Sequence, residues 1–112
     1  MLRVAVAALT LSLAAAPVLA ADGAQLFNMQ CKMCHGGSPM GPSLAGVAGS
    51  KIGEGTFAFS PALKTKGGVW TDANLDAFLR SPPAFAPGTK MMISVPNDAN
   101  RAAIIGYLKT LK

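Results

Sequence analysis

Residues that build catalytic and metal sites are scarce in this sequence. Its 112 residues include two cysteines, one histidine and five acidic residues. The acidic residues show no paired spacing that would favour carboxylate-based acid–base chemistry, so we expect them to lie on the solvated surface. They are Asp22, Glu54, Asp72, Asp76 and Asp98. Two cysteines allow only one disulfide, which excludes a framework of several bridges.

The first 20 residues have the pattern of a secretory signal peptide. Arg3 precedes an uncharged apolar run over residues 4–16, and small residues lead to a cleavage site after residue 20. We therefore predict a signal peptide at 1–20, a mature domain at 21–112 and a periplasmic location. The competing interpretation is a retained membrane anchor, because residues 4–21 form an uncharged stretch of 18 residues, the lower limit for spanning a bilayer.

The predicted mature domain is small and rich in glycine and proline. Its 92 residues contain all 12 glycines and seven of the eight prolines. A domain of this kind has little core, and an exported one usually relies on disulfides, a metal or a cofactor. Without Arg3, nine Lys and Arg oppose five Asp and Glu, a net charge of +4 that favours acidic partners. Nucleic acid is not expected, because the basic residues are scattered and the chain is predicted to be exported.

Both cysteines and the only histidine lie in the segment CKMCHGG, residues 31–37. A disulfide here would constrain little of the chain, and structural zinc needs four ligands where Cys31, Cys34 and His35 supply three. A thioredoxin-like redox pair should follow a buried strand, but the preceding ADGAQLFNMQ contains no β-branched residue. The pattern CxxCH is the attachment signature of c-type haem. We therefore predict one covalent haem c, with two thioether bonds and His35 on the iron.

The function then depends on the second axial ligand of the iron. Five methionines of the predicted mature chain are candidates: Met29, Met33, Met40, Met91 and Met92. Met29 and Met33 lie too close to the attachment site to reach the opposite face of the haem. Methionine is by default a core residue, so the sequence pattern leaves the others open.

Helical patterns dominate the rest of the sequence. Asn97 is a predicted N-cap before a terminal helix whose apolar residues recur at helical spacing. Thr71 is a predicted N-cap of a second helix, which we expect Pro82 to end, and Ser60-Pro61 can open a short third helix. No segment alternates convincingly between apolar and polar residues. The prediction is an all-α fold with long loops.

The segment VWTDANLDAFLRSPPAFAPGTKMM, residues 69–92, resembles the class I cytochrome c family, whose hallmark is a Pro-Gly-Thr-Lys-Met motif after a helix. The resemblance extends over essentially the whole mature chain. Residues 22–33 match the first helix of the family, residues 41–44 match its GPxL turn, and NRAAIIGYLKTLK at residues 100–112 matches its terminal helix. The resemblance implies a small cytochrome c fold with three main helices, a short helix and long loops wrapped around one covalent haem.

The resemblance also implies roles for single residues. Met91 would supply the sulfur ligand on the second face of the haem, and the Pro42 carbonyl would hold the other nitrogen of His35. Trp70 lies where the family places a tryptophan beside a haem propionate, and Ser60 is a second candidate donor. In the same way, Gly23 and Phe27 of the first helix would cross Ile104 and Tyr107 of the last.

Three positions depart from the family pattern. A tyrosine that commonly donates to the methionine sulfur is replaced by Phe78, so that hydrogen bond should be absent. A tyrosine that serves a propionate in many members is replaced by Phe59. Met92 directly follows Met91 and is a possible competing ligand.

The predicted function is one-electron transfer in the periplasm, without enzymatic activity. A haem with His and Met ligands has no open site on the iron, and the thioether raises the potential relative to two imidazoles. We expect a monomer without stable membrane insertion after cleavage, with acidic redox proteins as partners that dock near Lys32 and Lys90. One alternative is an electron-accepting subunit bound permanently to a periplasmic dehydrogenase. Another is a haem ligand sensor or peroxidase in which Met91 is labile.

Overall fold

The structure is a computed structural model that describes Ala5, Ala7 and residues 22–112. The predicted signal peptide, residues 1–20, lies outside the described residues apart from those two alanines, so its cleavage stays a prediction. Among the described residues, no helix combines the length and apolar character that a membrane span requires.

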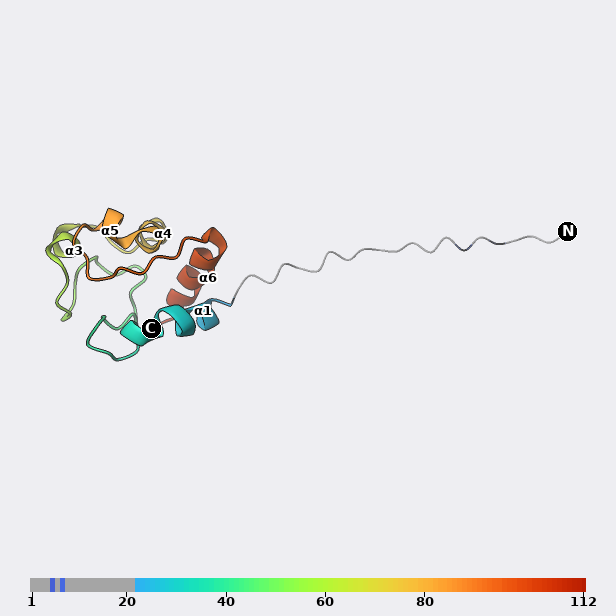
Figure 1. The fold of residues 1–112 in the computed structure, drawn as a ribbon, viewed down its shortest axis with the longest axis horizontal. Helices are drawn as coiled ribbons and strands as arrows, with labels where there is room; N and C mark the ends of the chain where they lie inside the picture. Colours follow the sequence, from blue (N-terminus) through green and yellow to red (C-terminus); the bar gives the residue numbers. More distant parts are fainter. Residues whose placement is uncertain (1–4, 6, 8–21) are drawn as a thin grey trace.

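Helices are the only regular elements of the described domain (Figure 1). In chain order they are α1 (Gly23–Gln30), α2 (Lys32–His35), α3 (Pro61–Thr65), α4 (Asp72–Arg80), α5 (Pro82–Phe85) and α6 (Asp98–Leu108). Within residues 22–112, strand-like pairing is limited to one isolated bridge between Lys51 and Val69. The predicted all-α fold is therefore confirmed, with α1, α4 and α6 as the main helices and three short helices where one was expected.

The three predicted helix starts are confirmed, and each has a side-chain cap. The side chain of Asn97 accepts a hydrogen bond from the Asn100 amide at 2.9 Å, and that of Thr71 accepts one from the Asn74 amide at 3.1 Å. Ser60 does the same for the Leu63 amide at 3.4 Å. Each cap satisfies a helix-terminal N–H that has no carbonyl partner within the helix, so these starts are determined locally.

Two helix boundaries differ from the prediction. The first helix does not continue to residue 33: α1 ends at Gln30, Cys31 leaves ideal helical geometry with φ −113°, and α2 begins at Lys32. Pro82 does more than end α4, because it is also the first residue of α5. A proline lacks the N–H that would continue α4, but that missing N–H costs nothing in the first turn of a new helix.

The domain is organised by the crossing of α1 and α6 (Figure 1). A Cβ atom on Gly23 would lie 2.1 Å from the Ala103 carbonyl oxygen, so only glycine permits this approach. Beside it, the rings of Phe27 and Tyr107 pack with centroids 5.1 Å apart, and Ile104 is completely buried. The predicted crossing is confirmed. It places the start of α2, and with it the cysteine-histidine segment, against the core.

Candidate functional site: a cavity lined by Cys31, Cys34, His35 and Met91

One cavity of about 1140 Å³ brings the predicted site residues together. Its lining includes all seven of them: Cys31, Cys34, His35, Pro42, Ser60, Trp70 and Met91. These residues come from α2, the loop that follows it, the start of α3, the loop before α4 and the segment between α5 and α6. The cavity is slightly larger than the range of about 300–1,000 Å³ that is usual for small-ligand pockets, so it has room for a large cofactor.

The cysteines and the histidine are presented by one short turn. The amides of Cys34 and His35 both donate to the Cys31 carbonyl, at 3.2 and 3.0 Å. Both cysteines are free thiols and half-buried, and burial raises the pKa of the Cys31 thiol. The three side chains line one cavity from within five positions, Cys31 at the N-cap of α2 and Cys34 and His35 in its last two positions, which suits a single group that binds all of them.

The tautomer of His35 follows from its neighbour in the GPSL turn. The Nδ1 atom lies 2.8 Å from the Pro42 carbonyl oxygen. A carbonyl only accepts hydrogen bonds, so Nδ1 carries the proton and Nε2 keeps the lone pair that a metal needs. Gly41 makes this contact possible, because a Cβ there would lie 3.0 Å from the Nδ1 and Cε1 atoms of the ring.

Met91 is held by the turn that precedes it. Gly88 adopts φ 85°, a left-handed conformation that favours glycine, and the buried Thr89 donates its amide to the Ala86 carbonyl at 3.0 Å. The Met91 amide then donates to the Thr89 hydroxyl at 3.4 Å. Met91 is half-buried, whereas Met92 also lines the cavity but is 74% exposed.

Trp70 and Ser60 lie on another part of the wall. Trp70 is buried and stacks on Phe85 with centroids 5.6 Å apart, while Phe78 packs at 5.1 Å from it. Ser60 is also buried, and its oxygen accepts from the Leu63 amide. The hydroxyl proton of Ser60 is not used in that contact, so it can be donated into the cavity.

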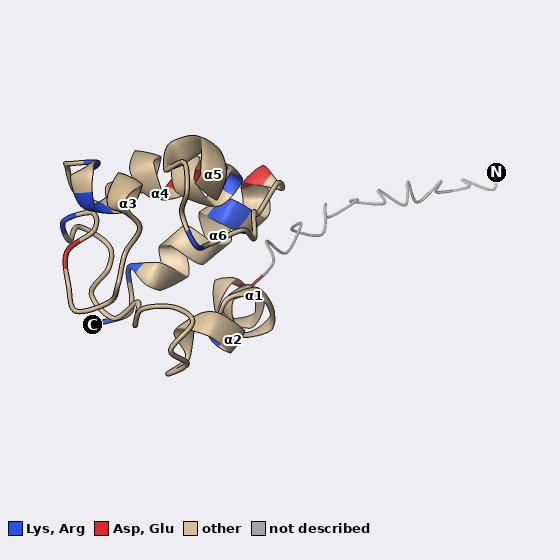
Figure 2. Cartoon of the chain, turned by 60° about the vertical axis from the view of Figure 1, so that its left-hand side comes forward, with Lys and Arg blue, Asp and Glu red and all other residues tan. Residues whose placement is uncertain are grey.

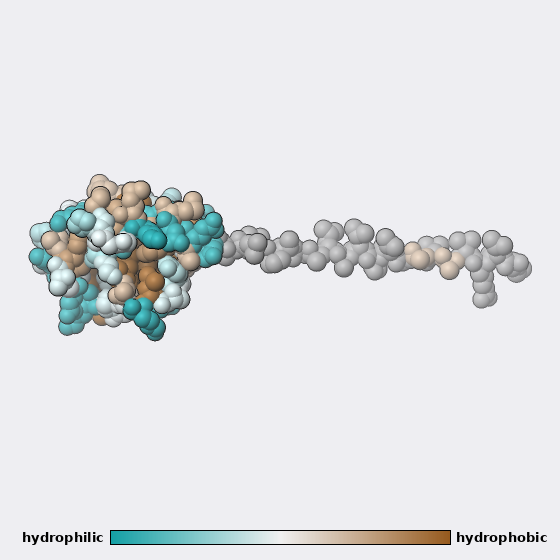
Figure 3. Space-filling model, turned by 90° about the horizontal axis from the view of Figure 1, so that it is seen from below, coloured by the Kyte–Doolittle hydropathy of each residue, from teal (hydrophilic) through white to brown (hydrophobic). Residues whose placement is uncertain are grey.

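Apolar side chains make up most of the remaining wall. Buried members are Leu63, Leu75, Leu79, Val95, Ile104 and Leu108. They come from α3, α4, α6 and the segment before α6, so the cavity lies at the centre of the domain. On the face shown in Figure 3, hydrophobic residues in brown are visible between hydrophilic residues in teal. The lining therefore favours an apolar, low-dielectric environment for whatever it holds.

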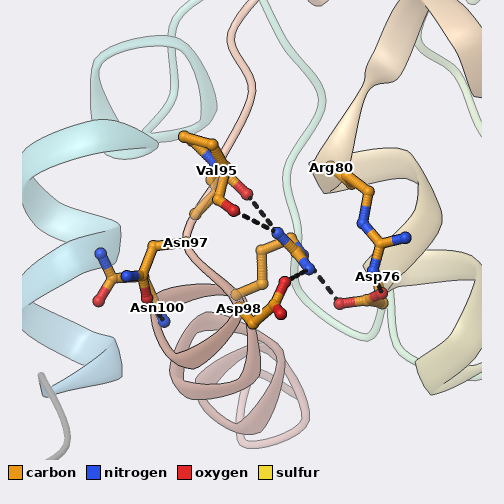
Figure 4. A network of polar contacts seen from close by, with 8 residues as sticks. Asp76, Arg80, Val95, Asn97, Asp98 and Asn100 are labelled. Carbon is orange, nitrogen blue, oxygen red and sulfur yellow. Dashed lines mark hydrogen bonds and ion pairs between the residues drawn. The ribbon is translucent and has the colours of Figure 1, made fainter.

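Asp72 and Asp98 lie on the exposed surface, as expected, and Asp76 is partly buried, but all three form ion pairs. Asp72 pairs with Lys109 at 2.7 Å, and Asp76 accepts from Arg80 at 3.1 Å and from the buried Arg101 at 2.9 Å. Asp98 also pairs with Arg101 (Figure 4). The helical spacings of Asp76 to Arg80 and of Asp98 to Arg101 were a readable signal, but the contact between Asp76 and Arg101 joins different helices.

This network changes the titration of its members. The hydrogen bond and the charge of Arg101, with a smaller effect of Arg80, hold the pKa of Asp76 below its usual value. In return, Asp76 and then Asp98 raise the pKa of the Arg101 guanidinium. Both groups are therefore charged at neutral pH.

The two lysines expected at the docking face lie in different surroundings. Lys90 lines the cavity, but its ammonium donates to the Ala58 carbonyl at 2.8 Å and lies 5.4 Å from the centre of the Phe57 ring. Lys32 is exposed on α2 and is not part of the cavity wall. Through its contact with Ala58, Lys90 ties two loops together. The basic positions as a whole are spread over several parts of the ribbon (Figure 2).

Comparisons with known proteins identify the family of this chain. Residues 20–112 match the family described as Cytochrome c. Cytochrome c of Tetrahymena pyriformis is 41% identical over 96 residues, which cover 82% of this chain and 88% of that protein. Cytochrome c2 of Rhodomicrobium vannielii is 41% identical over 95 residues, covering 79% of this chain and 75% of that protein.

A solved structure gives the same result at the level of the fold. Cytochrome cH from Methylobacterium extorquens superposes with a TM-score of 0.74 at 42% identity, covering 81% of this chain and 97% of that one. Some relatives are longer: the cytochrome c homolog of Bradyrhizobium diazoefficiens is 43% identical, but the match covers 49% of its length. By family match, sequence identity and fold together, this chain belongs to the cytochrome c family.

Proposed function

We propose that this protein carries single electrons in the periplasm through a haem that His35 and Met91 ligate. Proteins of the cytochrome c family are electron-transfer proteins with covalently bound haem c, and this chain belongs to that family. Its cofactor is therefore haem c. The attachment residues, the second axial ligand, the location and the absence of catalysis are our proposals.

The donor set of α2 fits this cofactor. Two free thiols separated by two residues suit the two vinyl groups of the porphyrin, and the next residue, His35, has its Nε2 lone pair available because Nδ1 donates to Pro42. We propose Cys31 and Cys34 as the thioether residues and His35 as the first axial ligand. The contact between His35 and Pro42, on the wall of a cavity that also contains Met91, is the observation that carries the proposal.

The other wall residues complete the site. We propose Met91 as the second axial ligand, because it is the half-buried methionine of the motif and lies on the same cavity as His35. Trp70 and Ser60 are proposed donors to the propionates, since each is buried on the wall with a polar hydrogen to donate.

The protein part of the mechanism is positioning and exclusion of solvent. The bound haem supplies the one-electron chemistry of its iron. Pro42 keeps His35 in one orientation, the turn at Gly88 keeps Met91 at the cavity, and the apolar wall limits water. When both axial positions are occupied, exogenous ligands have no open site, which favours electron transfer over catalysis.

Location and partners rest on the sequence. The leader pattern of residues 1–20 supports export to the periplasm, and the positive net charge supports acidic redox proteins as partners. We propose a monomer that is free of the membrane after cleavage.

A second candidate function keeps Met91 labile. Phe78 lines the cavity, and it stands where the class I cytochrome c pattern commonly has a tyrosine. Met92, the residue after Met91, also lines the cavity. A ligand-binding haem protein would follow if neither sulfur stays on the iron.

Absorption spectra of the oxidised and reduced protein test these alternatives after export in a host that attaches c-type haem. A low-spin spectrum with a weak red band from a sulfur-to-iron bond, and no binding of carbon monoxide by the reduced form, is the expected result. A high-spin spectrum would remove Met91 from the iron and favour the second function. Absence of covalent haem would reject the attachment site.

A further inference from the structure

The segment between α5 and α6, residues 86–97, carries Met91 and is anchored at its beginning. The Thr89 amide donates to the Ala86 carbonyl at 3.0 Å, and the Met91 amide donates to the Thr89 hydroxyl at 3.4 Å. Lys90 adds its contact with the Ala58 carbonyl. These contacts hold the chain up to Met91, but not beyond it.

The next three residues have no comparable support. Met92, Ile93 and Ser94 are exposed, and their backbone groups make no hydrogen bond with any described residue. Ordered contacts resume at Val95, which is buried and donates its amide to the Leu79 carbonyl at 2.8 Å. Met91 therefore lies just before an unsupported stretch whose far end must be fixed to prevent the segment from opening.

Arg101 adds two further hydrogen bonds at that far end. Its Nη1 atom donates to the carbonyls of Val95 at 2.9 Å and Pro96 at 3.0 Å. The side chain is only 1% exposed, which is unusual for an arginine. The position is possible because carboxylates on α4 and α6 balance the charge.

The same side chain is itself held rigidly. Nε donates to Asp76 of α4 at 2.9 Å, and Nη2 donates to Asp98 in the first turn of α6. The guanidinium is planar, so two fixed nitrogens determine where the third points. Arg101 therefore connects α4, α6 and the end of the Met91 segment through one rigid group.

We propose that Arg101 is a positioning residue that keeps Met91 at the cavity by clamping the far end of its segment. This inference rests on the proposed role of Met91 as axial ligand. Without the clamp, the stretch from Met92 to Pro96 would be anchored by the buried side chain and the amide of Val95 alone, and conformations with Met91 away from the cavity would be more populated. An exogenous ligand that competes with Met91 binds in proportion to that open population.

The experiment uses the oxidised holoprotein and imidazole as the competing ligand, followed by loss of the weak red band. Arg101→Met and Arg101→Lys remove the planar guanidinium. Asp98→Asn changes an exposed residue and weakens the contact that orients the Arg101 guanidinium. We expect Arg101→Met to raise the apparent affinity for imidazole about tenfold, the change that follows from a tenfold larger open population. Arg101→Lys should show a smaller rise, and Asp98→Asn the smallest.

Two controls separate positioning from general stability. Arg80→Met also removes a positive partner of Asp76, but Arg80 is 62% exposed and does not contact the segment. Lys109→Met removes the exposed ion pair with Asp72, which joins the end of α6 to α4 without involving Arg101 or the Met91 segment. Neither control should change the affinity for imidazole. If Lys109→Met raised the affinity as much as Arg101→Lys, or if Arg101→Lys and Asp98→Asn both left it unchanged, the proposal would be wrong, even if Arg101→Met fails to fold.

Amide hydrogen exchange separates this inference from the proposed function. If the wild-type spectrum lacks the red band, the ligation by Met91 fails, but faster exchange of the Val95 amide in Arg101→Lys would still support the clamp. If the band is present and the Val95 amide exchanges at the wild-type rate in Arg101→Lys, the clamp is rejected while the ligation stands.

Discussion

Replacing Gly23 with alanine should destabilise the protein through the crossing of α1 and α6. The added Cβ would lie 2.1 Å from the Ala103 carbonyl oxygen, whereas ordinary contacts begin at 3.4 Å. The helices would have to separate by the difference, about 1.3 Å. The three nearest atoms are the carbonyl oxygen and carbon of Ala103 and the Cβ of Tyr107, none of which can rotate away. Overpacking of this kind costs about 1–3 kcal/mol, and we expect the upper end.

Gly106→Ala is the matched control. Gly106 lies in α6, the helix that Gly23 contacts, but a Cβ on Gly106 would meet nothing within 4 Å. Because alanine is the better helix former, this change should stabilise by up to about 1 kcal/mol. The same chemical substitution therefore has opposite signs at two positions, depending only on the space around each.

Thermal unfolding of the holoproteins, followed by far-ultraviolet circular dichroism, measures both effects. For a domain of this size about 1 kcal/mol corresponds to about 4–8 °C, so Gly23→Ala should lower Tm by roughly 10 °C or more. Gly106→Ala should raise it by a few degrees. A Gly23→Ala protein with the wild-type Tm would refute the close approach of the two helices.

Three further predictions concern the ligand, the ion-pair network and the docking of partners. Met91→Ala should abolish the weak red band and admit carbon monoxide to the reduced protein, whereas Met92→Ala should change neither; the reverse pattern would make Met92 the ligand. Asp76 has a lowered pKa in the folded state, so its contribution to stability is present above its unfolded pKa and is lost as pH falls through the folded value. Asp76→Asn should therefore flatten the acid side of a plot of Tm against pH, and an unchanged acid slope would show that the pair with Arg101 does not contribute. Lys32→Glu should slow electron transfer to an acidic partner at low salt without changing Tm. Lys90→Glu should slow the transfer and also lower Tm, because Lys90 ties its segment to Ala58. Equal transfer rates for wild type and both variants would remove these lysines from the docking face.

Features set by neighbouring residues were readable from the sequence. The segment CKMCH places three proposed cofactor-binding residues within five positions, and their chemistry does not depend on how the rest of the chain folds. The caps at Ser60, Thr71 and Asn97 are equally local, because each side chain reaches an amide three residues ahead. The all-α class and the starts of α3, α4 and α6 were therefore predicted correctly from short-range patterns.

Boundaries that involve two competing local preferences were less predictable. Pro82 correctly indicated that α4 ends, but proline is also a favoured first residue of a helix, and only the folded chain shows that α5 begins there. The first helix similarly breaks at Cys31, in a sequence that gives no stop signal. In both places the boundary is visible only in the folded chain.

Only the tertiary structure decided which distant groups meet. Arg101 lies 25 positions from Asp76, and Lys90 lies 32 positions from Ala58, so no spacing rule joins them. Burial of Arg101 is possible because α4, α6 and the end of the Met91 segment converge on it and replace its lost hydration with carboxylates and carbonyls. The sequence alone determined which chemical groups are available for the haem, and the packing of the helices determined what holds them in place, because hydrogen bonds and close contacts depend on distance in space.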